Sequence, residues 1–279
     1  MIQDSFPHRL DTHYSGAVEF DDNCFLFLYR GKSILLKSDV GRFVLPRKSD
    51  FSTIEGIHNS TYIFTMDGVP CFVAGEIRQP DHPSFAFTDL SFFRTTTQKD
   101  LAWAAMVGYQ LHRWYIHNKF CGTCGTPTEK KHGDRALVCP GCQRVVFPHI
   151  HPAIIAAVIS DDEILLVRGT KSRGQWYSLI AGYVEIGETP EEAVVREVME
   201  EVGLEVKNIR YCMSQPWPLS SSLMAGFVAQ ASPDKQLHID KKEIVEAAWF
   251  PRHNLPKYSS TMSIAGKMIE CFERGTLRG

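Results

Sequence analysis

The residues with the clearest potential for chemistry are three glutamates in the second half of the chain, Glu197, Glu200 and Glu201. If this stretch is helical, their spacing places the three carboxylates on one side of the helix. Crowded carboxylates repel one another, so the cluster costs stability unless a cation binds. Hard divalent ions such as Mg²⁺ or Mn²⁺ prefer carboxylate oxygens and keep waters that substrate phosphates displace. The cluster therefore predicts a divalent metal site, although a solvated acidic helix has the same pattern.

A second candidate metal site consists of two Cys-x-x-Cys pairs, separated by fourteen residues. The four cysteines are Cys121, Cys124, Cys139 and Cys142. This spacing is typical of a tetrahedral Zn²⁺ site in which the protein fills all four positions. Because no coordination position is left open, we expect the zinc to be structural, replacing the core that so small a module cannot build.

The three glutamates need a helix to position them, and the flanking residues supply its signals. Thr189 is a suitable N-cap, Pro190 suits the first helical position and Gly203 is a typical stop, which predicts a helix over residues 190–202. We expect an apolar stripe on the face opposite the glutamates. Its members are Val195, Val198, Met199 and Val202. Arg196 lies beside the glutamates and is expected to pair with Glu192 or Glu200.

Apolar runs on both sides of this helix predict the elements of an α/β domain. The expected strands are residues 153–160, 164–167, 176–180, 206–215 and 223–229, with a last helix near residues 263–274. Strands alternating with helices are typical of a layered α/β fold. We therefore assign residues 149–279 to one α/β domain.

The first part of the chain reads differently. Short strands around residues 25–36, a hairpin at Asp67-Gly68 and a helix over residues 100–117 predict a β-rich (α+β) domain over residues 1–118. The cysteine-rich segment, residues 119–148, then forms a small zinc ribbon of its own. The sequence thus predicts three domains.

Composition excludes several classes of protein. With 44% hydrophobic and 22% charged residues among 279, the chain is neither disordered nor collagen-like. With a net charge of −2, the chain as a whole lacks the excess positive charge that binding to nucleic acid or an anionic membrane requires. Neither DNA nor a membrane is therefore an expected partner. Residues 113–151 carry six Lys/Arg against two acids, which favours either a local phosphate-binding surface or an ordinary solvated basic face.

With no apolar run of about 20 residues and no apolar secretory core, we expect a soluble cytoplasmic protein.

The glutamate segment has a more specific pattern. Residues 182–204 fit G-x5-E-x7-R-E-U-x-E-E-x-G-U, with U aliphatic, at every fixed position. This is the Nudix box, so residues 149–279 resemble a Nudix hydrolase domain. The resemblance implies an α-β-α sandwich that holds Mg²⁺ or Mn²⁺ against a pyrophosphate while water attacks phosphorus. It also implies Glu197, Glu200 and Glu201 as metal ligands, with Glu200 or Glu201 as the catalytic base.

The resemblance extends to two further metal ligands. The carbonyl of Ala181, just before the box, corresponds to a ligand position in the family, and Glu243 matches an additional metal-binding glutamate. Glu246 is the competing choice for the second position.

A segment after the box indicates a branch of the family. Residues 214–222 resemble the SQPWPFPxS motif of NADH pyrophosphatases, which also remove NAD caps from RNA and carry the same cysteine pairs. The chain departs from the motif at Leu219, where the motif has Phe, and at Ser220, where it has Pro. The aromatic rings of Phe147 and Tyr183 would stack on a base. The implied substrate-binding residues are Phe147, Tyr183, Gln215, Pro216, Trp217, Pro218, Leu219, Ser220, Ser221, Ser222 and Ala265.

The expected activity is hydrolysis of NADH or NAD⁺ to nicotinamide mononucleotide and AMP, and removal of the NAD cap from RNA to leave a 5′-monophosphate. The family resemblance also implies a homodimer to which residues 1–118 contribute. One alternative is a Nudix diphosphatase for other conjugates, such as ADP-ribose or diadenosine compounds. Another is a non-catalytic zinc-ribbon RNA-binding module, which would be expected to have lost box carboxylates. The box retains all four of them, Glu188, Glu197, Glu200 and Glu201.

Overall fold

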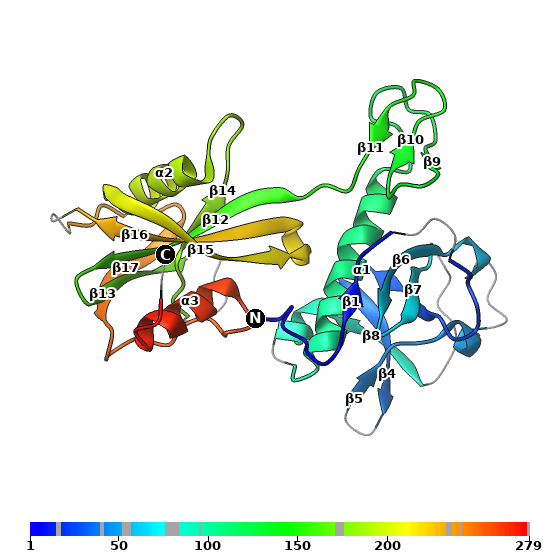
Figure 1. The fold of residues 1–279 in the computed structure, drawn as a ribbon, viewed down its shortest axis with the longest axis horizontal. Helices are drawn as coiled ribbons and strands as arrows, with labels where there is room; N and C mark the ends of the chain where they lie inside the picture. The colour runs from blue at the N-terminus through cyan, green and yellow to red at the C-terminus, as the bar shows by residue number, and fades with distance from the viewer. Residues whose placement is uncertain are drawn as a thin grey trace. The chain divides into compact units, whose positions relative to one another are not determined.

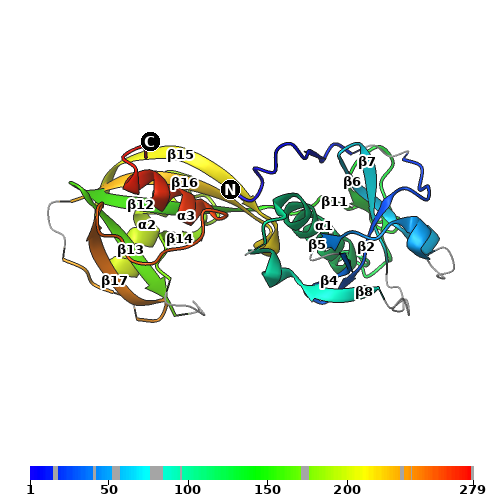
Figure 2. The ribbon, with the colours of Figure 1, turned by 90° about the horizontal axis from the view of Figure 1, so that it is seen from below.

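A computed structural model describes most of the chain, and its contacts divide the chain into two compact units. The described residues are 1–14, 18–39, 42–51, 57–75, 84–94, 96–170, 176–232, 236–239 and 241–277. The first unit contains residues 150–217 and 221–279 together with Met1, and the second contains residues 2–149 and 218–220. Figures 1 and 2 show the elements of each unit in two views.

A six-stranded mixed sheet forms the centre of the first unit. Its strands are β12 (His151–Ser160), β13 (Glu163–Gly169), β14 (Ile180–Tyr183), β15 (Val206–Trp217), β16 (Ser222–Ala231) and β17 (Ile244–Pro251). The order is β15-β16-β12-β13-β17, with β14 also paired to β12. Strands β12 and β16 run parallel, whereas the other neighbouring pairs are antiparallel.

The two helices of this unit, α2 (Pro190–Val202) and α3 (Ile264–Glu273), cover opposite faces of the sheet (Figure 1). Alternate residues of β12 account for this arrangement, because successive strand side chains point to opposite faces. Ile154 packs in the core that contains the buried residues of α2, and Ile155 packs in the core that contains those of α3. The expected α-β-α sandwich is confirmed.

Helix α2 begins and ends where the sequence predicts. The Thr189 hydroxyl accepts a hydrogen bond from the Glu192 amide, and the Glu192 carboxylate accepts one from the Thr189 amide, so the two residues form a capping box. Gly203 ends the helix with φ of 69°, a left-handed conformation that glycine adopts without strain.

The predicted apolar stripe of α2 is partly wrong. The helix buries Ala193, Val194, Val198, Glu201 and Val202. Two of the expected stripe residues, Val195 and Met199, are instead exposed. Val194, Val198 and Glu201 follow one another at intervals of four and three residues, so all three lie on the same helical face. One carboxylate of the cluster therefore lies at the edge of the core.

Two strands of this unit differ from the prediction. The strand expected over residues 176–180 is wrong, because regular pairing begins only at Ile180 and continues to Tyr183. Strand β13 pairs with β12 only at Ile159 and Ser160, which leaves residues 153–156 of β12 for β14. Strand β17 was not predicted, although it pairs with β13 along its length.

The second unit contains two four-stranded sheets and one long helix. The first sheet has β1 (Leu10–Asp11), β2 (Phe25–Phe27), β6 (Thr61–Met66) and β7 (Val69–Val73), and the second has β3 (Tyr29–Arg30), β4 (Ser33–Asp39), β5 (Arg42–Val44) and β8 (Phe85–Asp89). The expected hairpin at Asp67-Gly68 is confirmed by φ values of 51° and 79°, which suit a tight turn. The expected helix is α1 (Lys99–His117).

Short elements complete the second unit. The cysteine-rich segment forms a three-stranded sheet of β9 (Glu129–Lys130), β10 (Leu137–Val138) and β11 (Val145–Val146). The 3₁₀ turns are η1 (Lys48–Phe51), η2 (Ile57–Asn59), η3 (Leu90–Arg94) and η4 (Pro218–Ser220). Among the described residues, no helix has the length and hydropathy needed to cross a membrane.

Candidate functional site

The most unusual group of the acidic cluster is the carboxyl of Glu201. The residue is only 7% exposed, and its Oε2 atom is buried without a hydrogen-bond partner among the described residues. Burial raises the pKa of Glu201 to about 8, and the nearby charges of Glu197, Glu243 and Glu200 add to the effect. A buried acceptor that lacks a partner costs free energy. A cation in this position would remove that cost.

Glu197 lies against the backbone of β14. Its carboxylate occupies the space where a side chain of Gly182 would be, so any other residue at that position would displace the carboxylate. The Glu197 side chain is 12% exposed. Burial raises its pKa, while the hydrogen bond from Arg196 acts in the opposite direction. The first glycine of the box thus provides room for one of its carboxylates.

Arg196 connects the members of the box. Its Nε and Nη2 atoms donate to the two oxygens of Glu188 at 2.8 and 2.9 Å, and its Nη1 atom donates to Glu197 at 2.8 Å and Glu200 at 3.1 Å. Nη2 also donates to the carbonyl of Tyr183 at 2.9 Å. The bonds from Arg196 lower the pKa of Glu188 to about 2. These hydrogen bonds from the Arg196 guanidinium hold the segment before α2 and the helix itself in one arrangement.

The prediction for Arg196 is confirmed for one partner and wrong for the other. The guanidinium contacts Glu200, whereas Glu192 is engaged with Thr189 at the helix N-terminus. Two residues at the start of the box therefore have separate tasks, because Glu188 binds the arginine and Glu192 caps the helix.

A cavity of about 340 Å³ lies next to Glu201 and contains the two other expected metal ligands, Ala181 and Glu243. The Glu246 carboxylate instead forms an ion pair with Arg168 and accepts a hydrogen bond from its Nη2 atom at 2.8 Å. The geometry thus supports Glu243 over Glu246. Sequence reasoning missed three polar side chains of the cavity wall, and no pattern marks them in the sequence. They are Thr170, Ser178 and Lys242.

The donor set has the chemistry that a hard divalent cation requires, although no three of its carboxylates place an oxygen within 4.8 Å of one another in this structure. Carboxylate oxygens are the ligands that such ions prefer, and one of them, the Oε2 atom of Glu201, has no competing hydrogen bond in the described part of the chain. Glu197 and Glu200 form ion pairs with Arg196. These ion pairs keep two negative charges close to Glu201. We conclude that the residues present suit Mg²⁺ or Mn²⁺.

The predicted substrate-binding residues differ in exposure. The rings of Phe147 and Tyr183 are 56% and 53% exposed, as stacking on a base requires. Ser222 is buried, with its hydroxyl 3.4 Å from the Tyr183 hydroxyl. Ala265 is also buried, in the core on the α3 side of the sheet. Little of its side chain or backbone is therefore accessible to a ligand.

The segment that resembles the SQPWPFPxS motif spans the end of β15, η4 and the start of β16. Pro216 and Ser220 are exposed, Trp217, Leu219 and Ser221 are half-buried, and Gln215 and Pro218 are buried. The Gln215 amide is hydrogen-bonded to backbone groups near the start of α3. A direct contact of this amide with a substrate would require it to leave those partners.

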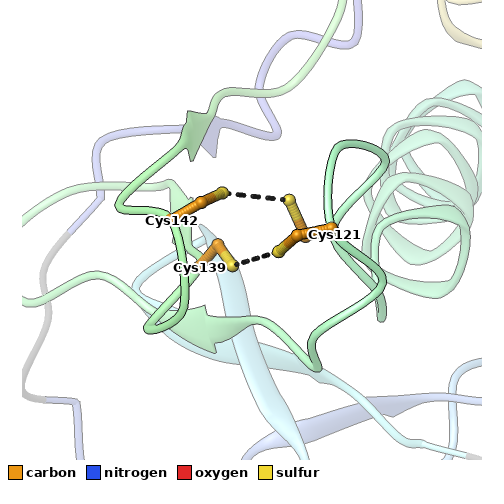
Figure 3. A group of neighbouring side chains, drawn as sticks. Cys121, Cys139 and Cys142 are labelled. Carbon is orange, nitrogen blue, oxygen red and sulfur yellow. Dashed lines mark hydrogen bonds between the residues drawn. The ribbon is translucent and has the colours of Figure 1, made fainter.

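The four predicted zinc ligands lie together (Figure 3). The Sγ atoms of Cys121 and Cys142 are 3.6 Å apart, and those of Cys124 and Cys139 are 3.4 Å apart. All four ligand atoms lie within 4.8 Å of one another, an arrangement that no other set of His, Cys, Asp or Glu reaches among the described residues. A hydrogen bond from the Thr123 amide lowers the pKa of Cys121 to about 6, which favours the thiolate that zinc binds.

Comparison with known families agrees with this geometry. Residues 149–270 match the model of the NUDIX domain. These residues therefore resemble a Nudix hydrolase domain. Residues 116–147 match the NADH pyrophosphatase zinc ribbon domain, which together with the four cysteines supports a structural Zn²⁺. Residues 24–114 match the NADH pyrophosphatase-like rudimentary NUDIX domain, a relationship that sequence reasoning missed.

Individual proteins are similar to part of this chain. Two proteins named NAD-capped RNA hydrolase NudC, from Klebsiella pneumoniae (strain 342) and Salmonella heidelberg (strain SL476), are 44% and 43% identical over 163 residues. The matched region covers 58% of this chain and 63% of each relative. The crystal structure of a Nudix hydrolase from Nitrosomonas europaea is 21% identical, with a TM-score of 0.49, and the match covers 56% of this chain and 91% of that one.

Proposed function

We propose that this protein hydrolyses the diphosphate of NADH or NAD⁺ to nicotinamide mononucleotide and AMP, and removes the NAD cap from RNA 5′ ends. The observation that carries the proposal is the buried Oε2 atom of Glu201, which has no hydrogen-bond partner among the described residues and lies beside a cavity shared with Glu243. The relatives named NAD-capped RNA hydrolase and the two NADH pyrophosphatase domain matches support this substrate class.

The catalytic ion in this proposal is Mg²⁺ or Mn²⁺. Its ligands would be the carbonyl of Ala181 and the carboxylates of Glu197, Glu200, Glu201 and Glu243. When bound, such an ion supplies positive charge for the diphosphate oxygens and lowers the pKa of water. Arg196 holds the carboxylates of Glu197 and Glu200 in position during the reaction through its hydrogen bonds to them.

A glutamate accepts the proton of the attacking water. Glu200 has a side chain that is 59% exposed, so it is accessible to water, whereas burial raises the pKa of Glu201 to about 8 in the absence of a cation. Glu200 is accessible to water and Glu201 lies beside the cavity, so both stand as the proposed catalytic pair.

The organic parts of the dinucleotide would bind to aromatic rings and to the segment after the box. Phe147 and Tyr183 offer exposed rings for stacking, each worth about 1–3 kcal/mol per base. Residues 215–222 supply Trp217 and the exposed groups around it, and the small exposed part of Ala265 supplies a further contact. Leu219 in place of the motif's Phe removes one ring, and Ser220 in place of Pro removes one constraint on the backbone.

The rest of the chain has supporting roles in this proposal. The chain then consists of three domains, residues 1–118, 119–148 and 149–279, and the active form is a homodimer. The net positive charge of residues 113–151 would contact the phosphates that follow the cap. We place the protein in the cytoplasm, because a reducing compartment keeps four zinc-binding cysteines reduced.

Initial rates on a panel of substrates test this proposal. The panel contains NADH, NAD⁺, NAD-capped RNA, ADP-ribose and a diadenosine polyphosphate, each with Mg²⁺ and with Mn²⁺. We expect the highest kcat/KM on one of the three NAD-type substrates, with AMP or 5′-monophosphate RNA as product. Preference for ADP-ribose or the diadenosine compound would instead assign a different Nudix diphosphatase activity. Tight RNA binding without metal-dependent cleavage would indicate a non-catalytic module.

A further inference from the structure

Gln215 connects the end of β15 to the beginning of α3. The residue is completely buried, with 0% of its surface exposed. Its Oε1 atom accepts a hydrogen bond from the amide of Ile264 at 2.6 Å, and its Nε2 atom donates to the carbonyl of Met262 at 3.0 Å. Both partners are neighbours of Ser263, the N-cap of α3. One side chain thus holds the chain on both sides of the helix start.

The first turn of α3 is held tightly in other ways as well. The Ser263 hydroxyl accepts a hydrogen bond from the amide of Gly266 at 3.2 Å and donates to the carbonyl of Ser260 at 2.8 Å. A side chain on Gly266 would overlap the carbonyls of Ser259 and Ser260, so the preceding loop packs directly on the helix backbone. The amide of Ile264 is one of the helix-start donors that no helical carbonyl can satisfy. Gln215 satisfies it from a distant part of the sequence.

We propose that Gln215 is a positioning residue, which acts on the substrate through the first turn of α3 and makes no substrate contact itself. Both polar groups of its amide are already bonded to backbone, and none of its surface is accessible to a ligand. The inference rests on the proposed function, in which Ala265, in this same turn, contacts the substrate. Gln215 thus links the segment after the box to α3.

The substitution Gln215→Glu tests this role, because it keeps the size of the side chain and the acceptor for the Ile264 amide. A protonated carboxyl can donate to the Met262 carbonyl, whereas a carboxylate cannot. At pH 6, where burial favours the protonated form, we expect a KM for NADH close to that of the unmodified protein. At pH 9 we expect KM to rise about tenfold relative to that protein, with kcat changed less than about twofold.

Hydrogen exchange of the substrate-free protein supplies a readout that is independent of activity. We expect the protection factors of the Ile264 and Gly266 amides to fall in the Gln215→Glu variant at pH 9, in step with the rise in KM. A rise in KM with unchanged protection would overturn the proposal, because it would indicate direct substrate contact. Lost protection with an unchanged KM would overturn it too, since the bond would then serve the fold alone.

Two further measurements keep these outcomes separate. If Gln215→Glu does not fold at pH 9, Ser263→Ala removes the other support of the same turn, and we expect it to raise KM and lower the protection of Gly266 together. Unchanged KM in that variant despite lost protection would contradict the proposal. Failure of the unmodified protein to hydrolyse NADH would contradict the proposed function, while the exchange measurement on Gln215→Glu would still report on the turn.

Discussion

Glu197 occupies the place where any side chain on Gly182 would be. Gly182 lies on β14 and pairs with Ile154 of the central strand, so the sheet fixes its position. Glu197 comes from the middle of α2, and its carboxylate is bonded to Arg196. The absence of a side chain on Gly182 therefore leaves the Glu197 carboxylate in its present position.

The substitution Gly182→Ala is expected to displace the Glu197 carboxylate and lower kcat/KM on NADH by about two orders of magnitude, the usual effect of a misplacement near 1 Å. Mn²⁺ affinity, measured by electron paramagnetic resonance, should weaken at the same time. Gly75→Ala is the matched control, because a side chain there meets no atom of the described residues within 4 Å. Normal Mn²⁺ affinity in Gly182→Ala would contradict the role given to this contact.

Arg196→Lys should lower kcat/KM about tenfold or more, because a lysine keeps the charge but cannot form the paired bonds that the guanidinium makes to Glu188. Steady-state kinetics on NADH measures the effect. Arg168→Lys is the control, since Arg168 pairs with Glu246 and not with the box. An equal fall in kcat/KM in the two variants would show that the paired bonds between Arg196 and Glu188 have no special part in the reaction.

The two candidate glutamates after the box can be separated by substitution. Glu243→Gln should weaken Mn²⁺ binding about tenfold or more, because Glu243 lines the cavity beside Glu201. Glu246→Gln should leave Mn²⁺ binding unchanged, because that carboxylate is held by Arg168. Isothermal titration calorimetry measures both. The reverse result would assign the ligand to Glu246.

Glu201 should make the stability of the Nudix domain depend on pH when no divalent ion is present. Its folded-state pKa of about 8 lies above the ordinary value of 4.5, so its contribution to stability is fully present below pH 4.5 and is lost as the pH rises through 8. The loss is on the order of a few kcal/mol.

Urea unfolding without added Mg²⁺ or Mn²⁺, at pH 6 and pH 9, measures this dependence. Glu201→Gln removes the buried charge, so its midpoint should fall less between the two pH values than that of the unmodified protein. Added Mn²⁺ should stabilise the unmodified protein at pH 9 and have little effect on the variant. Parallel pH curves for the two proteins would show that Glu201 is not the titrating group.

The zinc ribbon should lose its metal when one ligand is removed. Cys139→Ser is expected to reduce bound zinc from about one ion per chain to none and to abolish the hydrogen-exchange protection of β10, because the metal replaces a core in this module. Cys212→Ser is the control, since Cys212 lies outside the four-cysteine group. Full zinc content in Cys139→Ser would contradict the tetrahedral site.

The sequence was informative where chemistry constrains local spacing. The ends of α2 follow from Thr189, Pro190 and Gly203, because capping and chain termination act within one turn. The four cysteines likewise follow from their spacing, because two short pairs bring the sulfurs to one point.

Features that depend on tertiary packing could not be read in the same way. The burial of Glu201 depends on which side of α2 meets the sheet, and the exposure of Val195 and Met199 shows that hydrophobicity alone assigns this side wrongly. The internal bonds of Gln215 join positions about fifty residues apart, which no local pattern reveals. The relationship of residues 24–114 to Nudix domains was missed because α1 has no box glutamates to mark it.

The central claim is that the carboxylates of α2 hold a divalent ion for diphosphate cleavage. Chromatographic quantification of the products of NADH, with and without Mn²⁺, tests it most directly in the unmodified protein and in Glu201→Gln. We expect equimolar AMP and reduced nicotinamide mononucleotide from the unmodified protein only when Mn²⁺ is present. The variant should turn over at least about a thousandfold more slowly while retaining its fold. Cleavage without a divalent ion, or turnover by Glu201→Gln at the unmodified rate, would contradict the claim.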